Sequence, residues 1–150
     1  MKPNAAKTEV LIHKACPVVL RSSGNSLDIL AFRHPLAGSQ LVKGTVDGNE
    51  SASQAALREL AEESGISNAT PIAELGEFVV AEESQRWSLI LCDAPNLPET
   101  WEHFCEDDGG HLFRYFWHDL STYPDESWHP LFRIALDEVR RAIIDASENT

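Results

Sequence analysis

A run of residues with high helix propensity, residues 52–64, most constrains the fold that this chain can adopt. It contains neither Gly nor Pro and consists mainly of Ala, Leu, Arg and Glu, which are good helix formers. Ser51 and Gln54 at its start have the spacing of a capping box. Gly65 stands where a helix commonly ends in a left-handed residue. The sequence therefore predicts a helix over this run, with both of its ends defined.

Segments rich in β-branched and apolar residues lie on both sides of this helix, which indicates strands. The turn-forming residues 21–26 predict a hairpin between the earliest of them, and the polar residues 93–110 are expected to form a loop. Apolar residues recur at three- and four-residue steps from Leu131 onward, which predicts an amphipathic C-terminal helix. Strands and helices interleave in this order, so we expect an α/β sandwich with a mixed β-sheet, as a single domain over residues 1–150. The expected strands are residues 10–15, 17–20, 27–32, 40–46, 78–80, 87–91 and 112–117.

The charge of the chain restricts its partners. Twelve Lys and Arg against 24 Asp and Glu give a formal net charge of −12. This balance argues against binding to a nucleic acid polymer and against an anionic membrane surface, both of which require basic residues. The N-terminus has no signal-peptide pattern, and no apolar run is long enough to span a membrane. With three cysteines and no CxxC pair, neither a disulfide framework nor a zinc site is indicated, and we expect a cytoplasmic location.

Three carboxylates project from one side of the predicted helix. With Glu59 as reference, Glu62 is rotated by about −60° and Glu63 by about +40°, at roughly 100° per residue. Ionised together they repel one another, and they lie near the negative end of the helix dipole. A cluster of hard oxygen ligands suits Mg²⁺ or Mn²⁺. Taken alone, such an acidic helix is more typical of a solvated surface than of a metal site.

The residues around these carboxylates distinguish the two interpretations. Gly44 is followed after five residues by Glu50, and after seven more by Arg58 and Glu59. Aliphatic Leu60, the pair Glu62 and Glu63, Gly65 and aliphatic Ile66 complete the pattern. Residues 44–66 therefore resemble the Nudix box at every defined position. The strands before the box, and the strands and helix after it, are similar to a Nudix domain along the whole chain.

This resemblance implies a Nudix-like α/β/α sandwich, a catalytic loop–helix–loop and a divalent-metal-dependent hydrolase. Glu59, Glu62 and Glu63 would bind Mg²⁺ or Mn²⁺, with a backbone carbonyl near Lys43 or Gly44 completing the site. Arg58 would pair with Glu50 and orient the helix. The substrate would be a small nucleotide-like diphosphate, attacked by water at phosphorus, and substrate contacts are expected at Lys43, Gly44 and Trp101.

Residues outside the box are less informative. The candidates for an additional general base are the loop acids Glu102, Glu106, Asp107 and Asp108, although each of them taken separately is more typical of a solvated loop acid. Trp87 and Trp117 are expected in the sheet or core, and Arg33 and Arg86 at the surface. No role is assigned to five histidines that lack metal-ligand spacing, namely His34, His103, His111, His118 and His129.

Signatures of several Nudix subclasses are absent, so a nucleoside triphosphate or another nucleoside diphosphate derivative is the expected substrate by elimination. The alternative is a catalytically silent Nudix-fold module that senses a nucleotide. Such modules usually lose box residues, whereas this chain retains all of them. The oligomeric state is left open between a monomer and a homodimer.

Overall fold

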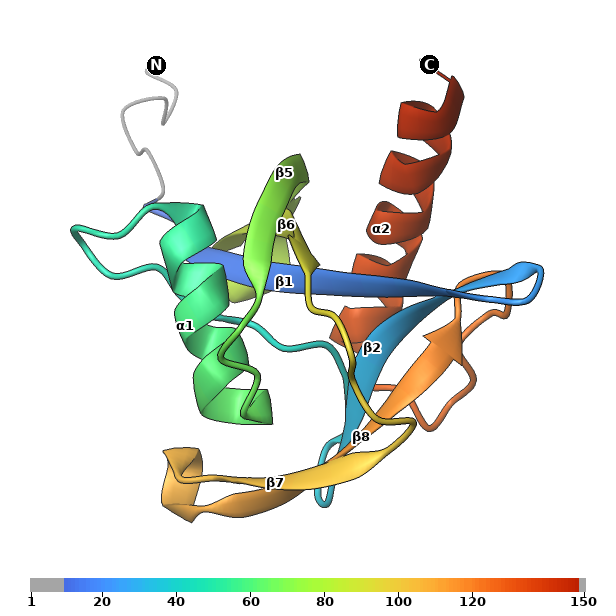
Figure 1. The fold of residues 1–150 in the computed structure, drawn as a ribbon. Coiled ribbons are helices and arrows are strands. Elements are labelled where there is room, and N and C mark those ends of the chain that lie inside the picture. Colours follow the sequence, from blue (N-terminus) through green and yellow to red (C-terminus); the bar gives the residue numbers. More distant parts are fainter. Residues whose placement is uncertain (1–9, 149–150) are drawn as a thin grey trace.

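The computed structural model describes residues 10–148 and places two helices around a mixed β-sheet (Figure 1). The strand order is β5-β6-β1-β2-β8-β7, with β3 paired to β2 and β4 paired to β1. Two short 3₁₀ turns, η2 (Ala81–Glu83) and η3 (Asp107–Gly109), precede β6 and β8. The helices are α1 (Ala52–Ser64) and α2 (Pro130–Glu148). The strands are β1 (Ile12–Ser23), β2 (Ser26–His34), β3 (Gly38–Gln40), β4 (Gly44–Thr45), β5 (Thr70–Val80), β6 (Gln85–Asp93), β7 (Trp101–Cys105) and β8 (His111–Asp119).

The long strand β1 is shared between two groups of strands. Its first part pairs in parallel with β6, from Ile12 opposite Gln85 to Val19 opposite Cys92. Its last residues, from Leu20 onward, pair with β2 in an antiparallel hairpin. The strands β2, β8 and β7 then continue antiparallel. The pairing partner of β1 therefore changes along its length, and β4 pairs with it beside Lys14.

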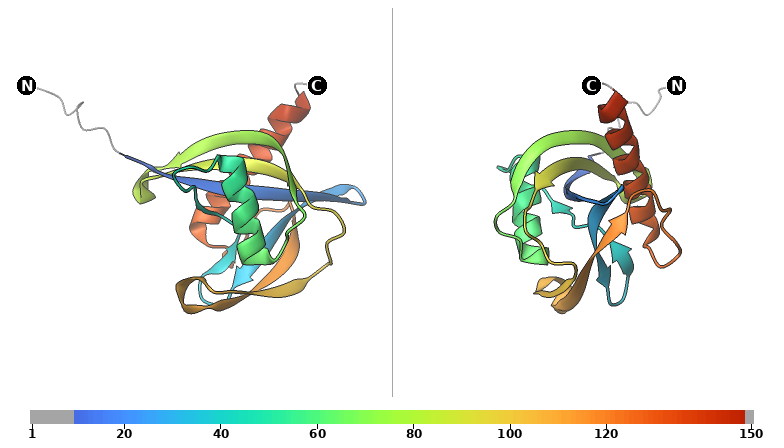
Figure 2. Two further views of the ribbon diagram at one scale, coloured as in Figure 1. Left: turned by 60° about the vertical axis from the view of Figure 1, so that its left-hand side comes forward. Right: turned by 45° about the vertical axis from the view of Figure 1, so that its right-hand side comes forward.

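Successive side chains of a strand point to opposite faces of the sheet, and this alternation divides the buried side chains into two cores. On β2, Leu30 and Phe32 pack in the core that includes Leu60 of α1, whereas Ile29 belongs to the core that includes Leu136 of α2. The two further views in Figure 2 show the helices on opposite sides of the strands. The α/β/α arrangement with a mixed sheet is therefore confirmed.

The helix α1 occupies the predicted residues. Ser51 accepts a hydrogen bond from the backbone N–H of Gln54, and the Gln54 side chain accepts one from the N–H of Ser51, which completes the capping box. Gly65 adopts φ +82°, and its N–H donates to the carbonyl of Ala61. The helix therefore begins and ends where local capping chemistry predicts.

Two sequence predictions were wrong in the connecting segments. Within the expected loop 93–110 the chain forms β7, which pairs with β8 along its whole length. The expected strand 40–46 is divided into the short strands β3 and β4, separated by residues 41–43. In both places, pairing with another strand of the sheet decides the conformation, and local propensity carries little of that information.

The amphipathic C-terminal helix is confirmed as α2, although its buried face is centred on Phe132, Leu136 and Val139, while Ile134 is half exposed. Trp87 is fully buried, as expected for a core residue. All three cysteines are buried and free. Within residues 10–148, neither helix combines the length and the hydropathy required to cross a bilayer.

Candidate active site

The centre of the site is the carboxylate of Glu59, which α1 directs against the backbone of β4. Glu59 is only 7% exposed. A Cβ atom built on Gly44 would lie 2.0 Å from Cδ of Glu59 and 2.2 Å from its Oε2. Carbon atoms do not approach this closely, so the carboxylate can occupy its position only because residue 44 has no side chain. Gly44 and Glu59, which lie 15 residues apart in the box, are therefore in direct contact.

Glu63, one turn further along α1, and Asp107, at the start of η3, complete an acidic cluster with Glu59. Carboxylate oxygens of the three residues all lie within 4.8 Å of one another. Glu59 and Glu63 come from the helix, and Asp107 comes from the segment that connects β7 to β8. Two distant parts of the chain thus contribute to a single group of oxygen ligands.

The electrostatics of this cluster favour a bound cation. Burial, together with hydrogen bonding to and repulsion by the Glu59 carboxylate, raises the pKa of Glu63 well above its ordinary range, although the nearby Lys43 ammonium opposes this shift. Two adjacent buried carboxylates cannot both ionise cheaply without positive charge between them. Hard oxygen donors at this spacing are the ligands that Mg²⁺ and Mn²⁺ prefer. The donor set therefore fits a divalent cation.

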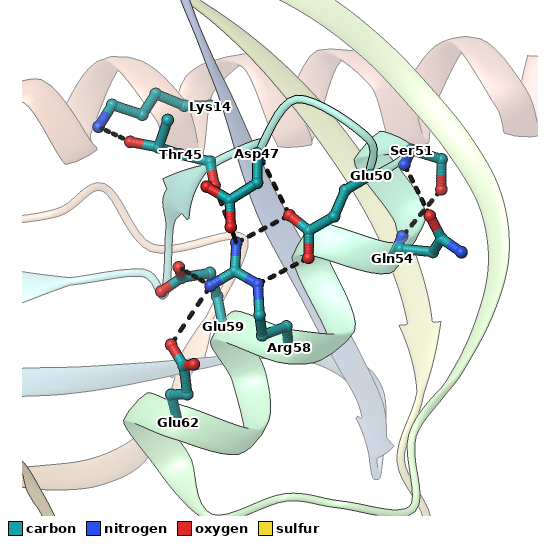
Figure 3. Close-up of polar contacts among 9 residues, drawn as sticks. All are labelled: Lys14, Thr45, Asp47, Glu50, Ser51, Gln54, Arg58, Glu59 and Glu62. Carbon is teal, nitrogen blue, oxygen red and sulfur yellow. Dashed lines mark hydrogen bonds and ion pairs between the residues drawn. The ribbon is translucent and has the colours of Figure 1, made fainter.

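Arg58 connects α1 to the loop that precedes it (Figure 3). Its Nε donates to Glu50 at 2.7 Å, and its Nη2 donates to the other Glu50 oxygen at 2.9 Å. The same Nη2 also donates to the carbonyl of Thr45 at 2.9 Å. The expected pairing of Arg58 with Glu50 is therefore present, as a bidentate contact whose geometry fixes the orientation of both groups.

Glu62 lies beside the cluster on its solvent side. Nη1 of Arg58 donates both to Glu59, at 2.7 Å, and to Glu62, at 3.3 Å. The side chain of Glu62 is 51% exposed, against 10% for that of Glu59. Among the described residues, the group whose carboxylate oxygens all lie within 4.8 Å of one another consists of Glu59, Glu63 and Asp107. Glu62 is not part of this group. The three helical carboxylates thus face the same region, but only two of them converge.

A cavity of about 300 Å³ opens beside the cluster and includes Glu63 and Asp107 in its wall. Lys43 also lines it, and the Lys43 ammonium lies 5.5 Å from the ring centroid of Trp87. Aromatic rings also line this cavity: those of Phe32 and Phe113 stack at 4.3 Å, and those of His34 and His111 lie 4.7 Å apart. His34 and His111 were assigned no role from the sequence, because they lack metal-ligand spacing; the approach of their rings comes from strand pairing.

The other candidate residues lie outside this cavity. The Trp101 indole N–H donates to the carbonyl of Ser64 at 3.0 Å, and its ring stacks on Tyr115. Glu102 pairs with Arg114 at 2.9 Å, on the outer face of the hairpin. Glu106 is exposed, and the side chain of Asp108 lies outside the part of the chain that the structure describes. Of the four loop acids, the structure places Asp107 in the cluster.

Comparison with known proteins adds independent information. Residues 12–137 match the family model of the NUDIX domain. A search of curated proteins found no match. The Ap4A hydrolase of C. elegans in a binary complex has 19% identity and a TM-score of 0.63, covering 90% of this chain and 98% of that chain. A MutT protein from Methanosarcina mazei Go1 has 20% identity and a TM-score of 0.61, covering 92% and 96%. A UDP-X diphosphatase has 12% identity and a TM-score of 0.66, covering 91% and 64%. At these identities, the similar structures establish the fold.

Proposed function

The chain belongs to the NUDIX domain family, and from this premise we propose that it is a divalent-metal-dependent hydrolase that cleaves a diphosphate linkage in a nucleotide-like substrate. The observation that carries this proposal is the cluster of Glu59, Glu63 and Asp107, whose oxygens lie within 4.8 Å of one another at the wall of a cavity. A cluster of this kind has no evident purpose in stabilising the fold, because buried like charges are costly.

The proposed metal ligands are Glu59, Glu62 and Glu63, with Asp107 as an additional acid. The ion, Mg²⁺ or Mn²⁺, would neutralise charge on the diphosphate oxygens when bound. Glu59 and Glu63 are held by the helix, and the exposed Glu62 closes the group toward solvent. The backbone at Gly44 lies against the carboxylate of Glu59, which supports the proposed contribution of a carbonyl from this loop.

The remaining residues bind and orient. Arg58 and Glu50 hold the loop of residues 44–51 against α1, so that the loop and the carboxylates keep one geometry. Lys43, in the cavity wall, supplies a positive charge for a phosphate group. Asp107 is the exposed member of the cluster. Since water reaches it first, we assign Asp107 the role of accepting the proton of the attacking water.

The proposed substrate is a nucleoside diphosphate derivative or a nucleoside triphosphate. The lining of the cavity beside the cluster includes both aromatic rings and the charged side chains of Lys43, Glu63 and Asp107. Aromatic rings suit a flat ring of the substrate, while Lys43 suits its phosphate. The names of two similar structures, an Ap4A hydrolase and a UDP-X diphosphatase, are consistent with this class.

The test is a panel of nucleoside triphosphates, dinucleoside polyphosphates and nucleotide sugars, incubated with the protein and Mg²⁺ in ¹⁸O-labelled water. We expect at least one compound to be cleaved, with the label appearing in a phosphate product, because water attacks phosphorus. Glu62→Gln and Glu63→Gln are expected to lose turnover by orders of magnitude while remaining folded. The control Glu102→Gln alters an acid on the outer face of β7 and should retain the wild-type rate.

Two outcomes contradict the proposal. Unchanged rates in both Glu62→Gln and Glu63→Gln would remove the acidic helix from the mechanism. Tight nucleotide binding without cleavage of any panel member would support a nucleotide-sensing module instead of an enzyme.

A further inference from the structure

The last turn of α1 carries Glu62 and Glu63, and its backbone carbonyls need partners from outside the helix. The final four carbonyls of an α-helix have no intrahelical donor. In α1 the first of these, on Ala61, accepts the N–H of Gly65 at 3.0 Å. The carbonyls of Glu62, Glu63 and Ser64 remain. Their partners decide what holds this end of the helix.

Three side chains of the hairpin formed by β7 and β8 donate to these three carbonyls. Nε2 of His103 lies 3.2 Å from the carbonyl oxygen of Glu62. The hydroxyl of Tyr115 donates to Glu63 at 2.7 Å, and the indole N–H of Trp101 donates to Ser64 at 3.0 Å. Each of these three consecutive carbonyls thus receives one side-chain donor from the hairpin. We call Trp101, His103 and Tyr115 the helix clamp.

The clamp residues share one face of the hairpin. Trp101 is opposite Tyr115 in the register of β7 and β8, and the two rings stack with centroids 5.0 Å apart. His103 follows Trp101 by two residues and therefore points to the same face. A Cβ atom on Gly65 would lie 2.9 Å from Nδ1 of His103. Hence the glycine that ends the helix also leaves room for this ring.

The same hairpin carries the third acid of the cluster. Cys105, the next residue on the inner face of β7, is 3% exposed and belongs to the core beneath α1. Asp107 follows two residues later, at the start of η3. In Figure 1 the C-terminal end of α1 points toward β7. The clamp therefore joins the element that holds Glu59 and Glu63 directly to the element that holds Asp107.

We propose that Trp101, His103 and Tyr115 are positioning residues that fix the distance between the helical carboxylates and Asp107, and so set the affinity of the site for its divalent cation. This inference rests on the proposed function. The three donors also lie at the negative end of the α1 dipole, where they offset part of the negative charge next to the carboxylates. Loss of one donor leaves a carbonyl unpaired and lets the hairpin move relative to α1.

The experiment measures Mn²⁺ binding by the electron paramagnetic resonance signal of free Mn²⁺, at a temperature where every variant is folded. Tyr115→Phe removes only the hydroxyl that donates to the backbone carbonyl of Glu63. Trp101→Phe removes the indole N–H that donates to the backbone carbonyl of Ser64. Because supporting partners of a metal site contribute about 10-fold or more to affinity, we expect the Kd for Mn²⁺ to rise about tenfold in each variant. With a cleaved substrate, kcat should fall while KM changes little.

The chain offers matched controls for both substitutions. Tyr123→Phe makes the same change at a tyrosine that is 80% exposed, beside Arg140. Trp117→Phe removes an indole N–H that donates to the carbonyl of Pro98, at 3.1 Å, and not to α1. Both controls are expected to bind Mn²⁺ as the wild type does. At position 103, the side chain of His103→Gln still carries an N–H donor, whereas that of His103→Leu carries none. We therefore expect His103→Leu to lose affinity for Mn²⁺ and His103→Gln to keep most of it.

Failure of this inference is distinguishable from failure of the proposed function. Glu63→Gln removes a proposed ligand directly, so Mn²⁺ binding should be lost in this variant. If Glu63→Gln loses Mn²⁺ while Tyr115→Phe and Trp101→Phe bind it as tightly as the wild type, the clamp is merely structural and the inference is overturned. If Glu63→Gln also binds as the wild type does, both proposals are overturned.

Discussion

The carboxylate of Glu59 occupies the space that a side chain at position 44 would need. We predict that Gly44→Ala displaces this carboxylate, because the new Cβ would lie 2.0 Å from Cδ of Glu59. A displacement of about 1 Å in a catalytic group can cost roughly 100-fold in rate, and we expect kcat/KM to fall by about this factor. Gly48→Ala is the control, since a Cβ at Gly48 has no atom within 4 Å. Equal activity of the two variants would contradict this assignment.

Asp107 is the acid that the structure adds to the helical carboxylates. We predict that Asp107→Asn lowers kcat by on the order of 100-fold or more, the contribution that general acid–base catalysis commonly makes. The neighbouring Glu106→Gln should leave kcat within about twofold, because Glu106 is exposed and not among the described residues that form the acidic cluster. Steady-state rates of the two variants, compared at saturating Mg²⁺, decide the assignment. A larger loss in Glu106→Gln would make Glu106 the base.

Among the residues of the site, the sequence predicted those that lie at fixed spacing within the box. It left undetermined the site residues that lie outside the box. Glu59, Glu63, Arg58 and Glu50 follow from the box, since one helix and one adjoining loop position them. Asp107 could not be distinguished from Glu106, because its approach to Glu63 depends on the register of β7 against β8. The positions of Tyr115, His34 and His111 likewise depend on strand pairing, that of β8 with β7 and with β2.

Among the elements, α1 is attached to its preceding loop through Glu50. The hydrogen bonds from Arg58, followed by the one from the Asp47 backbone, lower the pKa of Glu50 from 4.5 to about 2. A lowered pKa means that this carboxylate stabilises the fold above pH 4.5. This stabilisation is lost as pH falls toward 2, where the carboxylate becomes protonated in the folded state as well.

The corresponding prediction concerns the stability of Glu50→Gln. Above pH 4.5 the variant should unfold at lower denaturant concentration than the wild type, and the difference should shrink between pH 4.5 and about 2. Chemical denaturation at a series of pH values measures it. Glu82→Gln, at an exposed position in η2, should follow the wild-type curve throughout. A difference that stays constant down to pH 2 would show that the pairing with Arg58 does not depend on the charge of Glu50.

The elements also differ in how readily the sequence predicts them. The helix α1 was predicted to the residue, because Ser51, Gln54 and Gly65 provide local capping signals at both ends. The strand β7 was missed, because Trp101 to Cys105 lie between a proline-containing segment, residues 94–100, and the polar residues 106–110, and the strand forms by pairing with β8. An element that depends on tertiary pairing leaves little local signal.

The whole molecule carries a formal net charge of −12, and its acidic cluster concentrates part of that charge. A bound divalent cation should therefore stabilise the fold. At a Mg²⁺ or Mn²⁺ concentration 100 times Kd, linkage gives about 2.7 kcal/mol, equivalent to a rise of about 5–10 °C in Tm for a chain of this size. NaCl of equal ionic strength should give a much smaller rise. Differential scanning calorimetry with each salt measures the effect.

The variant Glu63→Gln tests the same linkage from the opposite direction. Without metal it should be at least as stable as the wild type, because it removes one of two adjacent buried carboxylates. Its Tm should no longer respond to Mn²⁺. A wild-type response to Mn²⁺ in this variant would place the stabilising ion elsewhere on the acidic surface.

The proposed function requires that the carboxylates of α1, Glu59 and Glu63 with Glu62, hold a divalent cation beside Asp107. Anomalous diffraction from a crystal soaked in Mn²⁺ tests it most directly, because the signal locates the metal itself. We expect a peak within coordination distance of Glu59 and Glu63, on the side that faces Asp107. A saturated crystal whose anomalous peaks all lie elsewhere, with these carboxylates unliganded, would contradict it.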